Sequence, residues 1–280
     1  MRRWARVLAF GLSTLFGLKP RGFFIPYRYA DQLPGPDARQ CYKALDPLFT
    51  AAEPDFLRLL ELIDAHADAL TAIGGDPPPA PRWNQDWFPR LDAAAAYVLV
   101  RDRKPRRIVE VGSGHSTRFM ARAVRDGGLP TQIVAIDPAP RAPIEGLGAT
   151  FIRRTVQDAG SEPFAALQAG DMLFIDSSHV LMPGTDVDVL FNHVLPALPA
   201  GVLVHIHDVF LPDAYPTEWD WRGYNEQLGA AALLQGGGYR LLWASRYAAT
   251  RMSGQVAASA AGRLELKAGA LEASLWIVKT

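Results

Sequence analysis

The sequence predicts a Rossmann-like, doubly wound α/β fold with a mostly parallel sheet, and three observations carry this prediction. Short apolar strands alternate with helical segments from Leu91 onward, which is typical of a parallel sheet covered by helices on both faces. The first strand of the series runs into a glycine turn, Gly112-Ser113-Gly114. The next strand ends on an acidic residue, Asp137.

Composition places the chain among ordinary globular proteins. Apolar residues make up 49% and charged residues 21% of its 280 residues. With 29 basic and 29 acidic residues the formal net charge is zero, so no global field recruits nucleic acid, and a small-molecule partner is expected. The single cysteine, Cys41, excludes an intramolecular disulfide and a cysteine-based zinc site, and it fits the reducing cytoplasm.

The N-terminus, "MRRWARVLAFGLSTLFGL", places arginines before a twelve-residue apolar run and so imitates a signal peptide. No small-x-small cleavage site follows, and the run is too short to span a bilayer, which takes about 20 residues. We interpret it as a helix that docks on the protein or on an oligomeric partner, so a homo-oligomer is possible. Peripheral membrane association is the alternative.

A second helix is predicted over Pro54–Ile73, with Pro at a first helical position and apolar residues at helical spacing. The glycines and prolines of "GGDPPPAPRW" then end it and give the best candidate boundary. We therefore expect residues 1–80 to form an N-terminal helical extension or cap. Residues 81–280 are expected to form the main domain.

The alternating elements follow in order along the main domain. A helix is expected at "LDAAAAYVLVRDR", then a strand and turn at "RIVEVGSG", and a helix at "STRFMARAVRDGG" with Ser116 or Thr117 near its cap. The later strands are "QIVAIDP", "ATFIRRT", "DMLFIDSSH" and "GVLVHIHDVF". After a helix at "YNEQLGAAALLQ", "YRLLWAS" and "EASLWIVK" show no helix pattern between them. They predict an antiparallel pair, with an antiparallel C-terminal strand, at one sheet edge.

The glycine turn predicts a nucleotide-type cofactor site, because ligands of open α/β sheets bind beyond the carboxyl ends of the strands. Asp137 is placed to accept hydrogen bonds from both hydroxyls of a ribose. Thr117 stands where a dinucleotide fingerprint has its third glycine, and no Gly-Lys-Ser/Thr follows. Glu110 would repel a pyrophosphate but help to hold a cationic amino-acid group. S-adenosylmethionine fits this pattern.

The motifs "VEVGSGHST", "IDP", "TVQD", "FIDSSH" and "HIHDVFLPDAYP" together resemble the strand ends of class I S-adenosylmethionine-dependent methyltransferases, specifically the bacterial methyltransferase domain 24 group. The resemblance covers roughly Trp83 to Lys279, and more weakly "GFFIPYRYADQLP". It implies that Glu110 and the turn glycines line the methionine moiety, Asp137 binds ribose, Asp158 lies by adenine and Asp176 lies by the methyl donor. The expected cofactor residues are Glu110, Gly112, Ser113, Gly114, His115, Ser116, Asp137, Gln157, Asp158 and Asp176.

Three of these residues have structural alternatives. Asp137 precedes a proline and is also a typical turn residue, while Asp158 is a typical helix-cap residue. His115 follows the glycine turn, where we expect it to shield the cofactor rather than to catalyse.

The expected catalytic residues are Asp176, His179, His207 and Asp208, from the ends of two strands that the fold places side by side. An aspartate and a histidine form a general-base arrangement for an acceptor hydroxyl. A divalent metal held by Asp176, His207 and Asp208 is the alternative, by similarity to metal-dependent sugar and catechol O-methyltransferases. Those enzymes carry paired acids where this chain has His207-Asp208. His205 and His193 are interpreted as structural.

Aromatic residues in "FLPDAYPTEWDWRGYNEQ" predict either a loop that closes over an apolar or sugar-like acceptor, or simple anchors of that loop. Trp83, Trp87 and Phe88 are expected to form an opposing wall. The sequence thus favours an S-adenosylmethionine-dependent O-methyltransferase acting on a small molecule. A nicotinamide-dependent oxidoreductase is the runner-up, disfavoured by Thr117. A cofactor-binding protein without transfer activity is the third hypothesis.

Overall fold

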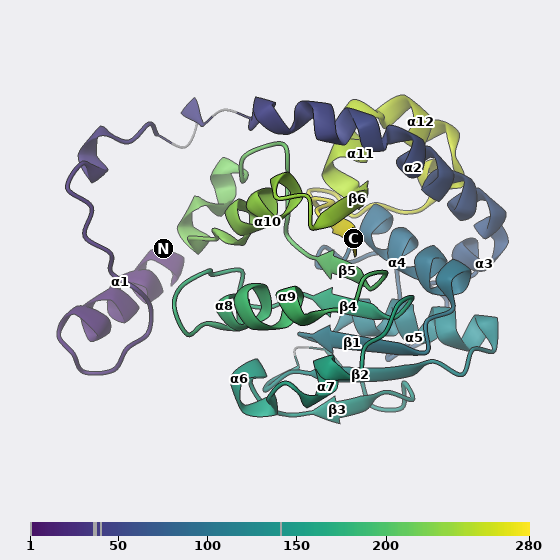
Figure 1. Ribbon diagram of the computed structural model, residues 1–280, viewed down its shortest axis with the longest axis horizontal. Coiled ribbons are helices and arrows are strands. Elements are labelled where there is room, and N and C mark those ends of the chain that lie inside the picture. The colour runs from purple at the N-terminus through teal and green to yellow at the C-terminus, as the bar shows by residue number, and fades with distance from the viewer. Residues whose placement is uncertain (1, 36–37, 40, 141) are drawn as a thin grey trace. The chain divides into compact units, whose positions relative to one another are not determined.

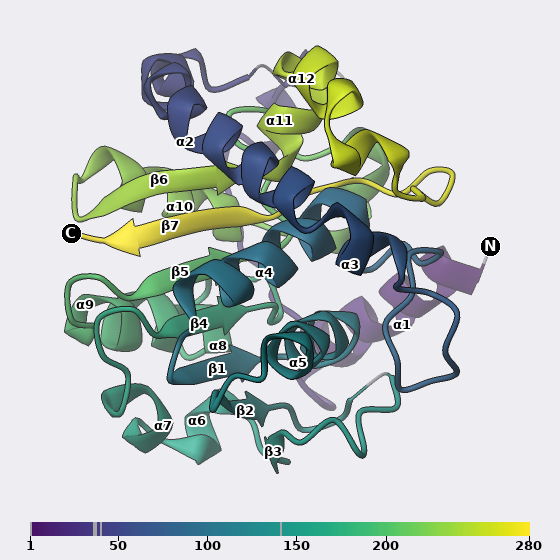
Figure 2. The same cartoon turned by 90° about the vertical axis from the view of Figure 1, so that its right-hand side faces the viewer.

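The computed structural model describes residues 2–35, 38–39, 41–140 and 142–280. The chain forms two compact units, residues 1–39 and residues 40–280. The smaller unit contains helix α1 (Arg2–Leu15) and the 3₁₀ helix η1 (Ala30–Gln32). The larger unit contains the sheet, shown from two sides in Figures 1 and 2.

The sheet has seven strands in the order β3-β2-β1-β4-β5-β7-β6. Strands β1 to β5 are parallel to one another, and β7 is antiparallel to both β5 and β6. The predicted doubly wound, mostly parallel fold is thereby confirmed. The strands are β1 (Arg107–Val111), β2 (Gln132–Ile136), β3 (Thr150–Ile152), β4 (Met172–Ile175), β5 (Leu203–Ile206), β6 (Tyr239–Ala244) and β7 (Leu275–Lys279).

The predicted antiparallel pair at one edge is also confirmed, with two differences in detail. The C-terminal strand β7 lies between β5 and β6, so that β6 forms the edge. The expectation of no helix between the two strands is wrong, because α11 (Ser245–Arg251), α12 (Ser253–Ala258) and the 3₁₀ helix η6 (Ala260–Arg263) stand there. These helices are short and rich in alanine and serine, so they carry no apolar period long enough to recognise.

Helices cover both faces of the sheet. Figure 2 shows α2, α4 and α5 on one face, with α8, α9 and α10 on the other. The helices of this unit before β6 are α2 (Asp46–Ala65), α3 (Ala67–Thr71), α4 (Arg90–Arg103), α5 (His115–Gly127), α6 (Val156–Ala159), α7 (Glu162–Ala165), α8 (Asp186–Val189), α9 (Leu195–Ala197) and α10 (Glu226–Gln235). The short turns are η3 (Lys43–Leu45), the π-helix η4 (Leu190–Val194) and η5 (Thr217–Arg222).

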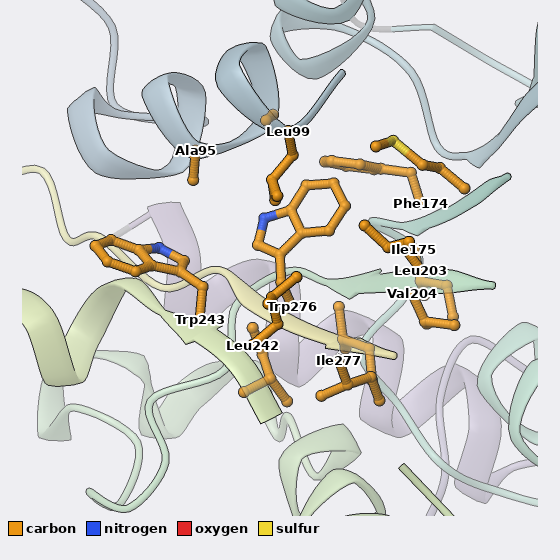
Figure 3. Close-up of a cluster of buried hydrophobic side chains, with 14 of the residues drawn as sticks. Ala95, Leu99, Phe174, Ile175, Leu203, Val204, Leu242, Trp243, Trp276 and Ile277 are labelled. Carbon is orange, nitrogen blue, oxygen red and sulfur yellow. The ribbon is translucent and has the colours of Figure 1, made fainter. Parts of the chain in front are cut away.

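Helix α4 lies at the centre of the core, and every residue from Leu91 to Val100 is buried. Its buried side faces the sheet, and Figure 3 shows Leu99 beside Trp276, with Ala95 on the same helix above Trp243 and Trp276. Trp276 of β7 meets Phe174 of β4 edge to face, with ring centroids 5.9 Å apart. Fixing β4 and β5 within this core also fixes the polar residues that follow them.

The helix predicted to begin at Pro54 begins eight residues earlier. Pro47 occupies the first turn of α2, where its missing N–H costs nothing, and Pro54 lies inside the helix. The apolar face of α2 packs against β6 and α4, so residues 46–65 belong to the sheet unit. The division into residues 1–80 and residues 81–280 stays a prediction.

Candidate active site

The glycine turn joins the ends of two central strands. Gly112 has φ +84°, and a Cβ there would lie 1.9 Å from the backbone oxygen of Asp176, so only glycine fits. The N–H of Gly112 donates to Ile136 O at 2.9 Å, and the N–H of Asp176 donates to Val111 O at 2.9 Å. The turn after β1 and the residue after β4 are therefore in direct contact.

Glu110 supports the helix that follows the turn. Its carboxyl is fully buried and accepts hydrogen bonds from the hydroxyls of Ser116 at 2.5 Å and Thr117 at 2.6 Å. Burial outweighs these bonds and raises its pKa to about 8, so the group is mostly protonated at neutral pH. Thr117 also accepts from the N–H of Gly114, the N-cap of α5. The predicted contacts of Glu110 and Ser116 with a cofactor stay predictions.

Asp137 lies immediately after β2 and faces the glycine turn. Its Oδ2 accepts from both the N–H and the hydroxyl of Ser113, each at 2.9 Å, and its Oδ1 accepts from the N–H of Ala139 at 2.8 Å. The residue thus does serve as a turn residue. A carboxylate has about four acceptor positions, so these bonds leave room for ribose hydroxyls. The predicted ribose contact remains a prediction.

The other expected cofactor residues lie on neighbouring segments. His115 begins α5; burial first, and then Arg118 and Arg82, lower its pKa to about 4, so the ring is neutral. Asp158 is exposed in the first turn of α6 and accepts from the hydroxyl of Thr155, the helix N-cap, at 2.9 Å. Gln157 donates to Gly184 O at 2.9 Å. Their predicted roles toward a cofactor remain predictions.

An ionic cluster forms where β4 and β5 end. The Nδ1 of buried His179 lies 2.8 Å from Glu226 Oε2, and its Nε2 lies 3.4 Å from both Asp176 Oδ1 and Asp208 Oδ2. Burial lowers the pKa of His179, but Asp208, Asp176 and Glu226 outweigh it and hold that pKa well above its ordinary value. His179 is therefore an imidazolium surrounded by three carboxyl groups.

Glu226 is a member of this cluster that sequence reasoning missed. It lies at the start of α10, 47 positions after His179, and is fully buried. Its Oε1 has no hydrogen-bond partner among the described residues, so its position is specified by the contact with His179. The sequence "YNEQLGAAALLQ" shows an acid near the start of a predicted helix, but nothing local indicates that this acid is buried or which residue it contacts.

The cluster is held by an unusual backbone. His179 (φ +60°) and Asp208 (φ +55°) are two of the three non-glycine residues with positive φ in the described ranges. This conformation costs roughly 1–2 kcal/mol per residue, and such costs concentrate at functional sites. The oxygen of His179 accepts the N–H groups of Asn225 and Glu226 at 3.1 and 3.3 Å, which ties its loop to α10.

The two histidines of "HIHD" have different surroundings. His205, inside β5, is fully buried, stacks on Phe174 at 3.7 Å and contacts Ser274 Oγ at 2.9 Å, which agrees with the structural interpretation. His207 lies just beyond the strand, and its Nε2 lies 2.9 Å from Trp87 O, to which it donates. Burial lowers the pKa of His207, but Asp176 and Asp208 reverse the shift and raise it.

Residues 109–209, from β1 to just after β5, match the model of a methyltransferase domain. This part of the chain is therefore similar to a methyltransferase domain. The predicted resemblance to class I methyltransferases is confirmed here. No curated protein matches the sequence.

Solved structures with a related arrangement come from several organisms. An O-methyltransferase from Bacillus cereus in complex with SAH is 13% identical, over 80% of this chain and 91% of that one, with a TM-score of 0.44. The SAH-bound methyltransferase PaMTH1 from Podospora anserina is 18% identical, over 92% of this chain and 99% of that one, with a TM-score of 0.45. The O-methyltransferase TomG from Streptomyces achromogenes is involved in tomaymycin synthesis and is solved in complex with SAM. It is 17% identical, over 79% of this chain and 89% of that one, with a TM-score of 0.41. Scores below 0.5 support no conclusion about this chain.

The strand ends of the methyltransferase domain do not fit the expected metal ligands. The Nε2 of His207 is engaged by Trp87 O, and the imidazolium of His179 lies between Asp176 and Asp208, where a cation would balance them. The described ranges contain no group of three or more His, Cys, Asp or Glu residues placed to hold a metal ion. The donor set fits a protonated histidine among carboxylates instead.

The aromatic loop after β5 is anchored and also reaches the cluster. Trp219 and Tyr215 meet the buried Phe210 edge to face, at 5.0 and 5.8 Å between ring centroids. Tyr224 lies 4.6 Å from the ring of His179. Arg222 stacks over Trp219 at 3.9 Å, and its Nη1 lies 3.7 Å from Asp208 Oδ2. The aromatic residues therefore anchor the loop to the core, and the loop also lies where it could close over an acceptor.

Only one of the three aromatic residues expected to face the loop across an acceptor is exposed. Trp83 and Phe88 are buried and pack against Phe119, at 4.9 and 6.4 Å between ring centroids, so they belong to the core. Trp87 is 53% exposed. The two core aromatics look the same as surface ones in sequence because the loop around them has no period that marks a buried face.

Proposed function

We propose that the chain is an S-adenosylmethionine-dependent methyltransferase that methylates a hydroxyl of a small-molecule or sugar-like acceptor. The match of residues 109–209 to a methyltransferase domain supports the reaction class. The observation that carries the proposal is the contact between Gly112 and Asp176. It makes the candidate cofactor turn and the ionic cluster two sides of one site.

The candidate cofactor residues suit such a donor. When bound, S-adenosylmethionine supplies a methyl group on a positively charged sulfur. Asp137 would accept from the ribose hydroxyls, while the glycine turn admits the methionine moiety close to its backbone. Neutral His115 would cover the site without repelling the sulfonium. Asp176, whose side chain is 32% exposed, would lie beside the methyl group.

The ionic cluster supports the following roles in handling the proton. Methylation of a hydroxyl would form an O–CH₃ bond as the S–CH₃ bond of the donor breaks and S-adenosylhomocysteine leaves, and the hydroxyl proton must pass to a base. His179 already carries a proton, so it cannot be that base, and the carboxylate of Asp208 takes the proton instead. His179 and Arg222 offer positive charge to the acceptor oxygen as it becomes more negative. Glu226 is a positioning residue, because its bond to Nδ1 aims Nε2 at Asp176 and Asp208.

Substitution of Asp208 by Asn tests this assignment. Transfer of labelled methyl groups from S-adenosylmethionine to a panel of phenol and sugar hydroxyls should fall by roughly 100- to 10,000-fold, the range for a lost base. Cofactor affinity, measured by calorimetry, should stay nearly unchanged. Chelator should leave wild-type turnover intact. Wild-type turnover by Asp208→Asn would remove Asp208 from catalysis, and metal-restorable loss on chelation would revive the metal hypothesis.

A further inference from the structure

The N-terminal unit exposes a large share of the molecule's big apolar side chains. Residues 7–33 hold 12 of the 17 exposed large hydrophobic residues found in the described ranges. Phe16, Leu18 and Phe24 are 74%, 80% and 68% exposed. Apolar groups concentrated in this way mark an interaction surface, whereas single exposed ones are ordinary.

Helix α1 places four exposed apolar residues along one side and Arg6 on the other. Val7, Leu8, Leu12 and Leu15 lie within about 140° of the helix circumference, at 100° per residue. All four are exposed. Arg6 is on the opposite side, where its guanidinium and that of Arg21 lie over the ring of Phe10 at 5.1 and 5.0 Å.

The chain after α1 is folded back onto the end of the helix. Ser13 Oγ donates to Lys19 O, and Thr14 Oγ1 accepts from the N–H of Arg21, both at 2.9 Å. These bonds close a turn that presents the exposed side chains of Phe16 and Leu18 at the end of the helix. Helix α1 and the turn after it therefore both expose apolar side chains.

The charge of the N-terminal unit indicates the kind of surface that it binds. Residues 1–30 contain six basic residues and no acidic one: Arg2, Arg3, Arg6, Lys19, Arg21 and Arg28. Two copies of this segment would repel each other. In the larger unit the described residues include five exposed large apolar side chains, against 12 in the much shorter N-terminal unit: Leu57, Trp87, Trp221, Leu228 and Leu266.

We propose that residues 2–33 bind the surface of an anionic lipid membrane. The apolar face of α1 and the turn enter the interface between headgroups and acyl chains, while Arg6, Lys19, Arg21 and Arg28 contact anionic headgroups. This is a surface attachment, since no helix among the described residues is long and apolar enough to cross a bilayer. The proposal does not depend on the methyltransferase activity.

Cosedimentation of the full chain with vesicles tests the proposal. Vesicles of phosphatidylcholine with about 30% phosphatidylglycerol should bind at least about 10-fold more protein than pure phosphatidylcholine, since each basic residue near an anionic surface contributes. Binding should fall strongly at 0.5 M salt, where the charges are screened. Equal binding to both vesicle types, or none to either, would overturn the proposal.

Matched variants show whether this segment is responsible. Leu12→Asp, at a position that is 43% exposed, should lower vesicle binding at least about 10-fold. Leu57→Asp, on α2 at a position that is 42% exposed, should leave it unchanged. Arg6→Glu with Lys19→Glu should abolish the preference for anionic vesicles. If light scattering instead shows an oligomer that Leu12→Asp disperses, the partner is a second copy and the proposal is wrong.

Discussion

The protonation of single residues decides what the candidate site can do. His179 is held as an imidazolium by three carboxyl groups, and Glu110 is held neutral by burial. Both states differ from those expected for the same residues in water. The sequence predicted that a histidine and aspartates would meet here, but not that the histidine would be charged, since that depends on Glu226 from a distant helix.

Replacing Glu226 with Gln should lower the pKa of His179. The variant removes one of the three acidic neighbours while keeping the shape of the side chain, so the imidazolium loses support. Proton NMR titration of the histidine rings should show the His179 resonance moving toward its neutral form at lower pH than in the wild type. Glu61→Gln, at an exposed position of α2, is the control. An unchanged titration of His179 would contradict the positioning role.

The raised pKa of Glu110 should make stability depend on pH. Its folded-state pKa is about 8 against an ordinary 4.5, so its neutral form is favoured in the folded protein. The stabilisation is complete below pH 4.5 and is lost as pH rises through 8, with a slope of at most about 1.4 kcal/mol per pH unit. Denaturant unfolding between pH 5 and 8 should show this decline in the wild type. In Glu110→Gln this contribution should be absent; a parallel decline in both proteins would contradict the pKa assignment.

At the scale of elements, the parallel strands and their glycine turn were predictable, because buried strands form continuous apolar runs. Helix α2 was predicted to start too late because Pro54 was read as a first-turn residue, although Pro47 fills that role. Helices α11 and α12 were missed because their alanines and serines carry no apolar stripe. Contacts between elements, such as that of α10 with the loop of His179, leave no local trace in sequence.

Replacing each glycine of the turn between β1 and α5 by alanine tests whether close backbone contact determines the turn. Gly112→Ala should destabilise the fold by roughly 2–4 kcal/mol, since its Cβ would overlap the backbone of Asp176 and its φ is positive. Gly114→Ala meets no atom within 4 Å and has an extended φ, so it should cost less than about 1 kcal/mol. Denaturant midpoints measure both. Equal losses would show that the close approach does not determine the turn.

At the scale of the whole molecule, the zero net charge conceals an uneven distribution. The chain is neutral overall, yet its first 30 residues carry only positive charge, so the remainder is net acidic. The overall composition therefore predicts no partner attracted by charge, whereas the N-terminal unit has the positive charge to attract an anionic one. The acceptor could not be predicted from the sequence either, since its fit depends on the shape formed by the loop around Trp219 and Tyr224.

Calorimetric titration measures directly whether the chain binds S-adenosylmethionine beside Asp137. The full chain should bind S-adenosylmethionine and not NAD. Asp137→Ala should weaken binding by about 1.5–3 kcal/mol through lost charged hydrogen bonds, whereas Asp31→Ala, an exposed acid in the N-terminal unit, should bind as the wild type does. Binding of NAD alone, or unchanged S-adenosylmethionine affinity in Asp137→Ala, would contradict the account.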